Sequence, residues 1–214
     1  TELLSPSRRS PALEQVLAGY LSRCPWKFEL HSEFQEIQLL DAVPAGPDRR
    51  NWFTLFRLQL KNHESLQLAL PLALITQEEL KVPLPESGLA VLAAIHNRQQ
   101  ELAGYLVESP AFAPVRRQWA EQILALPLKS SGALGELVLD GEIASLPPAA
   151  SHPQDEGVPE DSACYYEHGR SRITMDRRYF LHFLHRVDAG PRPEEELARY
   201  FSTLGRDLPV PRYL

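Results

Sequence analysis

The stretch WFTLFRLQL-KNHE-SLQLALPLAL occupies residues 52–74 and consists of two apolar segments joined by four polar residues. Alternate positions of the first segment fall on one face of an extended strand, and they are Trp52, Thr54, Phe56, Leu58 and Leu60. The side chains of Arg57 and Gln59 then fall on the other face. A short polar link between two such segments is typical of an antiparallel hairpin. We therefore predict a hairpin here, within a protein of the α+β class.

The residues before this hairpin predict one helix and one further strand. Ser10 is a good helix cap, and Pro11 fits the first helical turn, where the missing N–H costs nothing. The apolar residues that follow recur at helical spacing, and they are Leu13, Val16, Leu17, Tyr20 and Leu21. Residues 37–43 form a short apolar run that ends at a cluster of turn residues, so we expect a strand there.

Two more helices and a small hairpin are expected after residue 75. Ser87 is a candidate cap for a helix that reaches about Tyr105. Residues 114–126 carry an apolar stripe and predict a second helix, with Pro114 in its first turn. Residues 134–143 predict a strand or a hairpin that turns at Asp140-Gly141.

The proline-rich and acidic composition of residues 148–161 predicts a linker or an exposed loop. We therefore divide the chain into residues 1–147, this linker and residues 162–214. The last part should contain strands at residues 163–166, 172–175 and 179–187 and a helix at residues 193–204. Three acidic residues directly after Pro193 oppose the positive helix dipole at its start.

The composition excludes several classes of protein. The chain has 214 residues and a net charge of -6, whereas nucleic-acid binders usually carry a basic excess. Its longest apolar stretch, residues 66–75, is about half the ~20 residues that a membrane span needs. No secretory leader is visible, and two cysteines are too few for a disulfide framework. We expect a cytoplasmic protein that binds neither nucleic acid nor membrane.

The residues alone predict no catalytic residue and no metal site. The seven histidines include no HExxH and no Cys/His metal spacing, and the chain has no GxSxG, P-loop or GxGxxG motif. His182 and His185 are three residues apart on an expected strand, so their side chains should point to opposite faces.

The stretch YFLHFLHRVDAGPRPEEELARYF, residues 179–201, resembles the N-lobe of a maltokinase. In that family a strand of the type L-I-L-K-L-F-R-R leads into a turn ending in G-x-N-P, and then into a helix that carries a glutamate. Residues 37–44, 53–74 and 109–112 resemble parts of the N-terminal cap of the same family, in the same order. The resemblance is therefore collinear over most of the chain.

This resemblance implies a cystatin-like antiparallel sheet with helices, followed by a partial protein-kinase-like N-lobe of antiparallel strands and one helix. Maltokinases belong to the aminoglycoside-phosphotransferase-like kinases and transfer a phosphoryl group from ATP to maltose. The same module also occurs fused to trehalose synthase. A structure without a helix-wrapping antiparallel sheet at residues 35–75 would instead indicate an unrelated α+β protein.

The resemblance places degenerate nucleotide-site positions at His182, Glu196, Glu167 and Ser171. His182 stands where the family has the lysine that binds the phosphates, and a histidine is shorter and mostly neutral at pH 7. Glu196 matches the helix glutamate. The family's phosphate-covering E-Q-S-N-T-S aligns with residues 167–172, where Glu167 and Ser171 match best. Weak binding of ATP and Mg²⁺ to these residues stays open.

Two functions follow from the resemblance. The first is a non-catalytic cap and pseudo-kinase N-lobe module that acts through a protein partner, such as trehalose synthase or another α-glucan enzyme. The second is a piece of a bifunctional trehalose synthase–maltokinase that phosphorylates maltose with ATP. In both cases the kinase C-lobe, with its catalytic and metal-binding residues, is expected outside these 214 residues.

Overall fold

The structure is a computed structural model, which describes residues 4, 10–24, 34–45, 50–80, 90–112, 115, 116, 118, 119, 128–139, 164–167, 170–175 and 179–187. The linker expected at residues 148–161 and the helix expected at residues 193–204 lie outside the described residues. The proposed division of the chain at the linker therefore stays a prediction.

Helix α1 (Pro11–Leu21) begins where the sequence predicts. The Ser10 hydroxyl accepts a hydrogen bond from the Leu13 N–H at 3.4 Å, and Pro11 occupies the first helical position. The helix buries one side, which consists of Leu13, Leu17, Tyr20 and Leu21. The predicted apolar stripe is thus the face that packs.

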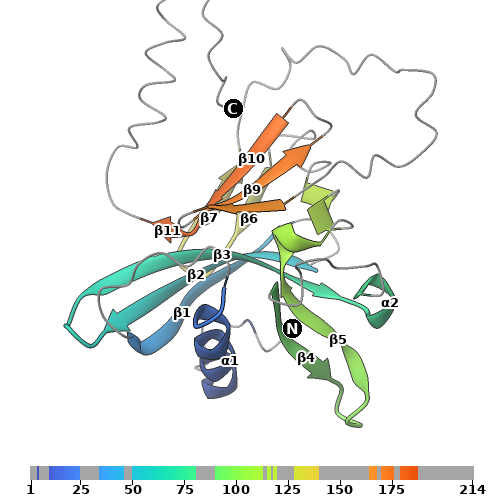
Figure 1. The fold of residues 1–214 in the computed structure, drawn as a ribbon, viewed down its shortest axis with the longest axis horizontal. Coiled ribbons are helices and arrows are strands. Elements are labelled where there is room, and N and C mark those ends of the chain that lie inside the picture. The colour runs from blue at the N-terminus through green and yellow to red at the C-terminus, as the bar shows by residue number, and fades with distance from the viewer. Residues whose placement is uncertain are drawn as a thin grey trace, which may run out of the picture.

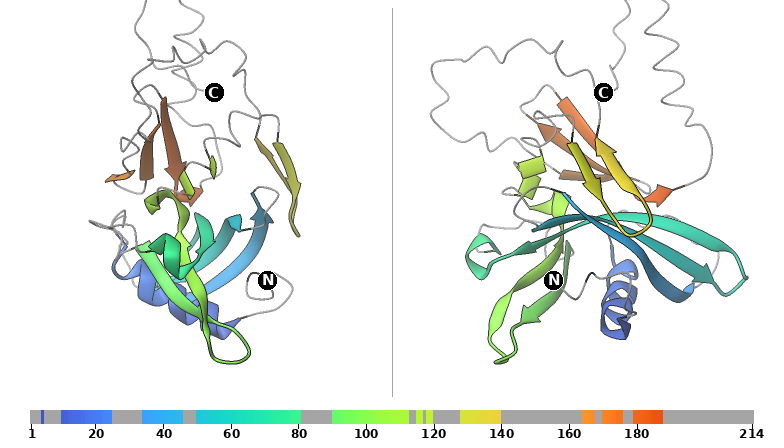
Figure 2. Two further views of the ribbon diagram at one scale, coloured as in Figure 1. Left: turned by 90° about the vertical axis from the view of Figure 1, so that its right-hand side faces the viewer. Right: turned by 180° about the vertical axis from the view of Figure 1, so that it is seen from behind.

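A six-stranded antiparallel sheet curls around α1 (Figures 1 and 2). Its main strands are β1 (Phe34–Pro44), β2 (Asn51–Leu60), β3 (Ser65–Ile75), β5 (Leu102–Glu108) and β4 (Val91–His96), in that spatial order. The predicted hairpin is confirmed, because β2 pairs with β3 in a register that places Leu58 opposite Leu66. The helix-wrapping sheet expected at residues 35–75 is present.

The helix predicted from Ser87 to Tyr105 is wrong, because this region contains β4, a turn and β5. The Asn97 side chain closes the turn by accepting hydrogen bonds from the N–H groups of Gln99 and Glu101, each at 2.9 Å. β5 then pairs with residues 72–75 of β3. The apolar residues here are spaced three and four apart, which also fits a helix. The turn closed by Asn97 and the pairing of β5 with the edge of β3 favour a hairpin instead.

Short helical elements flank the β4–β5 hairpin. A four-residue helix, α2 (Gln77–Leu80), precedes β4, and a 3-10 turn (Ser109–Ala111) follows β5. Residues 115, 116, 118 and 119 are helical, which agrees with the predicted start of a helix near Pro114.

A two-stranded hairpin, β6 (Leu128–Ser131) and β7 (Glu136–Leu139), packs on β1. Its turn lies at residues 132–135, whereas Asp140 and Gly141, where a turn was expected, lie outside the described residues. The buried Asp41 carboxylate holds this turn by accepting hydrogen bonds from the N–H groups of Ala133 and Leu134, at 2.8 and 2.9 Å.

The strands predicted in the last third of the chain are present as a three-stranded antiparallel sheet, which we call the small sheet. It consists of β10 (Tyr179–Leu184), β9 (Arg170–Met175) and β8 (Cys164–Glu167). After β10, the two residues of β11 (Arg186–Val187) return to the curved sheet and pair with β3.

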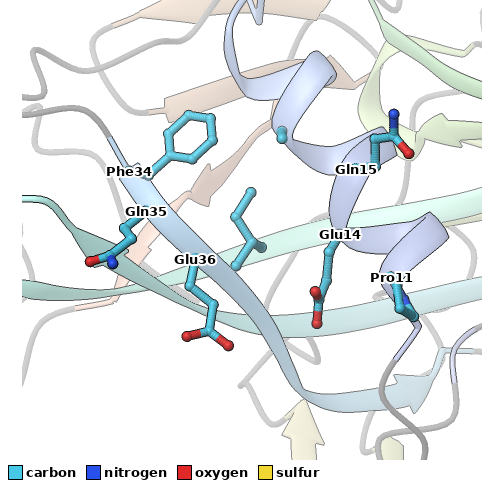
Figure 3. A pocket seen from close by; sticks show the side chains of 8 residues that line it. Pro11, Glu14, Gln15, Phe34, Gln35 and Glu36 are labelled. Atoms are coloured by element: carbon cyan, nitrogen blue, oxygen red, sulfur yellow. The ribbon is translucent and has the colours of Figure 1, made fainter.

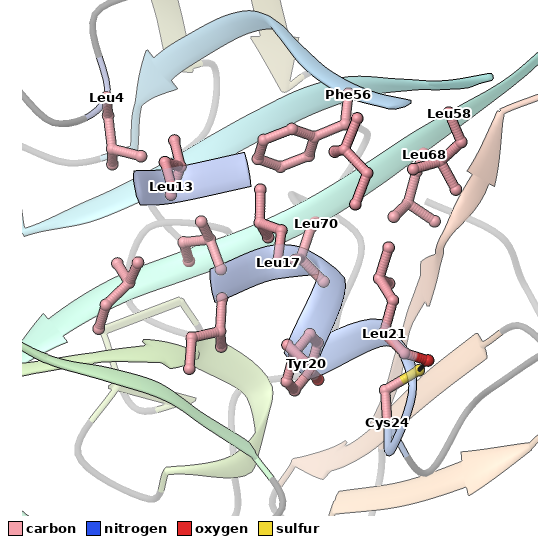
Figure 4. Close-up of a cluster of buried hydrophobic side chains, with 14 of the residues drawn as sticks. Leu4, Leu13, Leu17, Tyr20, Leu21, Cys24, Phe56, Leu58, Leu68 and Leu70 are labelled. Carbon is pink, nitrogen blue, oxygen red and sulfur yellow. Dashed lines mark hydrogen bonds between the residues drawn. The ribbon is translucent and has the colours of Figure 1, made fainter. Parts of the chain in front are cut away.

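The curved sheet has an apolar core on each side. On the concave side, α1 packs against residues such as Phe56, Leu58 and Leu70 (Figure 4). On the other side, where the small sheet lies (Figure 2), Phe53 and Phe183 enclose Trp119 with ring centroids 5.2 and 5.6 Å from it. The fold is therefore of mixed α/β type, mostly antiparallel, with a curled sheet and few helices. None of the described helices has the length and apolar character needed to cross a membrane.

Candidate functional site

The curved sheet forks along one edge of β3. β5 pairs with β3 at residues 72–75, whereas β11 pairs with β3 at Gln67 and Leu68. Between these two partners, the Ala69 N–H donates a hydrogen bond to the His185 carbonyl at 2.7 Å. The opening between β5 and β11, which we call the fork, is where the small sheet joins the curved sheet.

Pro71 explains why the sheet can open at this point. N–H groups alternate between the two edges of a strand, and the Leu74 N–H of β3 donates toward β2, to Arg50. The Ala69 N–H points the other way, so the nitrogen of Pro71 faces the fork as well. Proline has no N–H to donate and is normally confined to strand edges. A proline inside a buried strand is therefore tolerated because β3 is locally an edge at the fork.

Four buried polar side chains fill the fork, and we call them the fork network: Tyr20, Glu108, Ser171 and His185. Each is 0% exposed. The Tyr20 hydroxyl donates to Glu108 Oε2, and Glu108 Oε1 lies 3.0 Å from Ser171 Oγ. Ser171 Oγ lies 2.6 Å from His185 Nε2. The network thus joins α1, the end of β5, the small sheet and the segment before β11.

The remaining ring nitrogen of His185 sets its tautomer. Nδ1 lies 3.1 Å from the Ala69 carbonyl oxygen, which only accepts, so Nδ1 carries a hydrogen. Burial lowers the pKa of His185 to about 4, although the bond to Ala69 acts in the opposite direction. A neutral imidazole of this tautomer presents Nε2 to Ser171 as an acceptor.

Burial also shifts the titration of the two tyrosines near Glu108. It raises the pKa of Tyr20 far above its ordinary value, and Glu108 adds to the effect through its charge, where it is ionised, and through its hydrogen bond. Burial likewise raises the pKa of Tyr166 on β8, with a further contribution from Glu108. Both phenols therefore stay protonated and act as fixed donors.

A serine, a histidine and a glutamate in contact invite comparison with a hydrolase triad, but the order differs. In a triad, the acid bonds to the histidine nitrogen that faces away from the serine. Here that nitrogen bonds to the Ala69 carbonyl, and Glu108 Oε1 lies on the serine side of the ring, 3.0 Å from Ser171 Oγ and 3.5 Å from His185 Nε2. Ser171 is also fully buried, so its hydroxyl has no access to a substrate. The fork network is a structural junction.

Of the described nucleotide-site positions, the structure places Ser171 and His182 on opposite faces of the small sheet. Ser171 faces the buried side of the small sheet, opposite Phe183 in the register. His182 is exposed and pairs with Arg172, so it lies on the other face. Glu167 is the last residue of β8, and Glu196 lies outside the described residues.

Outside the fork, a shallow hollow of about 260 Å³ lies between α1 and the start of β1 (Figure 3). Glu14 and Glu36 are among its lining residues. Within the part of the chain that the structure describes, no three His, Cys, Asp or Glu residues are grouped for a metal ion. Neither Cys24 nor Cys164 forms a disulfide.

Sequence reasoning missed the fork network. The sequence pattern places Tyr20 only in the apolar stripe of the first helix and indicates no role for Glu108. The prediction that His182 and His185 point to opposite faces is confirmed, because His185 is buried and His182 is exposed. The available signal was Pro71, whose presence in an otherwise buried strand marks an edge.

The chain matches no protein-family model and no curated protein.

Proposed function

We propose that this protein is a non-catalytic cap and pseudo-kinase N-lobe module that resembles maltokinase and acts through a protein partner in α-glucan metabolism. The collinear resemblance of residues 37–74, 109–112 and 179–201 supports this proposal. A curled antiparallel sheet around one helix, with a small antiparallel sheet joined to it, is compatible with a cap followed by N-lobe strands.

The observation that carries the proposal is the buried position of Ser171. By resemblance this serine belongs to the segment that covers the phosphates, yet its hydroxyl is buried between Glu108 and His185. His182, at the position of the phosphate-binding lysine, lies on the opposite face of the same sheet. Phosphoryl transfer depends on positioning and charge neutralisation. A buried serine and a mostly neutral histidine on opposite faces provide neither.

Titration with Mg²⁺–ATP by isothermal calorimetry tests the non-catalytic half of the proposal. We expect no binding at millimolar nucleotide. Saturable binding that is lost in both His182→Ala and Glu196→Ala would overturn the proposal and favour the alternative, an ATP-dependent maltokinase unit of a trehalose synthase fusion. His96→Ala is the matched control, because His96 is an exposed histidine at the end of β4.

The second part of the proposal, that the protein acts through a protein partner, is tested with purified trehalose synthase. We expect the two proteins to sediment together in analytical ultracentrifugation. Independent sedimentation at high micromolar concentration would contradict this choice of partner.

A further inference from the structure

Ser171 has a single hydroxyl hydrogen but two close polar neighbours. Its Oγ lies 3.0 Å from Glu108 Oε1 and 2.6 Å from His185 Nε2, both within hydrogen-bonding range. A hydroxyl donates one hydrogen bond and accepts up to two. Ser171 therefore donates to one neighbour, and the other neighbour has to donate to Ser171.

Two arrangements meet this requirement, and they contain the same number of protons. In the first, His185 is protonated and donates from Nε2 to Ser171, which donates to an ionised Glu108. In the second, Glu108 is protonated and donates to Ser171, which donates to a neutral His185. A concerted shift of two protons along Glu108, Ser171 and His185 interconverts them, so no proton is gained or lost.

The surroundings decide between the two arrangements. Among the described residues, the titratable groups next to this site are Tyr20 of α1, Cys24 just after α1, and Tyr166 and Cys164 of β8, with Arg116 close to Tyr166 and Cys164. The tyrosines stay protonated, and Arg116 donates to the carbonyls of Pro110 and Ala111 at 3.0 and 2.9 Å.

Glu108 and His185 are both 0% exposed, so an ion pair between them loses the hydration of both charges. The attraction between the two buried charges offsets this loss only in part. Burial also favours a neutral His185 at pH 7. The neutral arrangement keeps both Ser171 bonds without this cost.

We infer that Glu108 is the protonated member of the fork network at neutral pH, so that the junction between the small sheet and the curved sheet holds one dissociable proton. The donors then run in one direction, from Glu108 to Ser171, from Ser171 to His185, and from His185 to the Ala69 carbonyl. Tyr20 satisfies the second oxygen of Glu108. Loss of this proton leaves a buried negative charge and only one of the two Ser171 bonds, so the junction weakens as the pH rises.

The consequence for stability has a definite sign. An unfolded glutamate ionises near pH 4.3, at about the value of a model peptide. A folded chain that keeps this proton binds more protons than the unfolded chain at neutral pH, so its stability falls as the pH rises. The effect is about tenfold in the unfolding equilibrium constant for each pH unit.

Glu108→Gln tests whether the junction holds this proton, because a glutamine amide donates to Ser171 and accepts from Tyr20 as a protonated Glu108 does, but binds no proton itself. We would measure urea unfolding of the full chain at about pH 5 and about pH 7. The unfolding constant of the wild type, divided by that of Glu108→Gln, should rise about a hundredfold between these values. His185 contributes equally to both proteins and cancels. Glu101→Gln is the control, since Glu101 is exposed in the β4–β5 turn, and its ratio should not rise with pH.

A ratio that stays constant with pH would overturn the inference, because it would mean that the folded junction holds no extra proton, on Glu108 or on His185. The ratio rises alike in the two arrangements, which bind the same number of protons, so infrared spectroscopy is needed to show which group holds the proton. The wild type at neutral pH should show the carbonyl band of a protonated carboxylic acid, and the absence of this band would contradict the inference.

Discussion

The apolar core around α1 and the fork network hold neighbouring parts of the same molecule together by different means. The core consists of side chains such as Leu17, Phe56 and Leu70, each no more than 1% exposed, and its stabilisation depends on area removed from water. The fork network has few groups, and each donor needs one particular acceptor. Apolar burial therefore keeps α1 in the sheet, whereas the small sheet is held both by the apolar contacts of Ile173 and Phe183 and by the directional bonds of the fork network. The predictions below separate these two contributions.

The largest effect is expected in the apolar core. Phe56 is 0% exposed on β2, and Phe56→Ala should lower the free energy of unfolding by about 3–5 kcal/mol, because it removes a buried ring and leaves a cavity. Urea denaturation measures the change. Leu55→Ala, at the half-buried neighbouring position, should cost clearly less. Equal losses would contradict the assignment of faces in β2.

A pH-dependent loss is expected from His185. An unfolded histidine takes up a proton below about pH 6.5, whereas the folded protein does so only near its lowered pKa of about 4. The contribution of His185 to the free energy of unfolding is therefore fully present above about pH 6.5. It falls by about 1.4 kcal/mol per pH unit as the pH drops from there toward about 4.

This loss should be visible in Glu108→Gln, because in the wild type the shared proton on Glu108 opposes it. Urea denaturation of that variant across the window measures the slope. A flat profile would mean that His185 is charged in the folded protein.

A smaller loss is expected at Ser171. Ser171→Ala removes the hydroxyl between Glu108 and His185 and leaves both buried groups without that partner, which should cost about 1–3 kcal/mol. Ser131→Ala, in the exposed position at the end of β6, is the control and should change stability little. A Ser171→Ala variant as stable as the control would show that the fork network contributes nothing.

The smallest effect is expected for the ion pair of Arg50 and Glu79, whose nearest atoms are 2.5 Å apart. Both side chains remain partly exposed, at 37% and 27%, so solvent screens the pair, and Arg50→Ala should cost about 0–1 kcal/mol. Burial raises the pKa of Glu79, but hydrogen bonds from Arg50 and Thr76 outweigh it and leave this pKa below its ordinary value. A loss as large as that of Phe56→Ala would contradict this order.

The elements that follow from local pattern could be predicted from the sequence. The β2–β3 hairpin has strict alternation, α1 has a capping serine with a proline behind it, and the small sheet was expected strand by strand. The region of β4 and β5 could not be predicted in this way, because its apolar spacing also fits a helix and the choice depends on pairing with the distant β3.

The fork network could not be predicted from the sequence either, because it also depends on residues that are distant along the chain. Tyr20 and Glu108 are 88 residues apart, and Glu108 and Ser171 are 63 residues apart. A buried glutamate is unfavourable until both partners are in place. The local sequence therefore does not predict that Glu108 is buried. Only the folding of the curved sheet brings Tyr20, Glu108 and Ser171 together.

Amide hydrogen exchange of Ser171→Ala, compared with the wild type, tests most directly whether the fork network seats the small sheet. We predict that β9, β10 and β11 lose protection, while α1 and β2 exchange as in the wild type. An unchanged pattern, or an equal loss of protection in α1 and β2, would contradict this account.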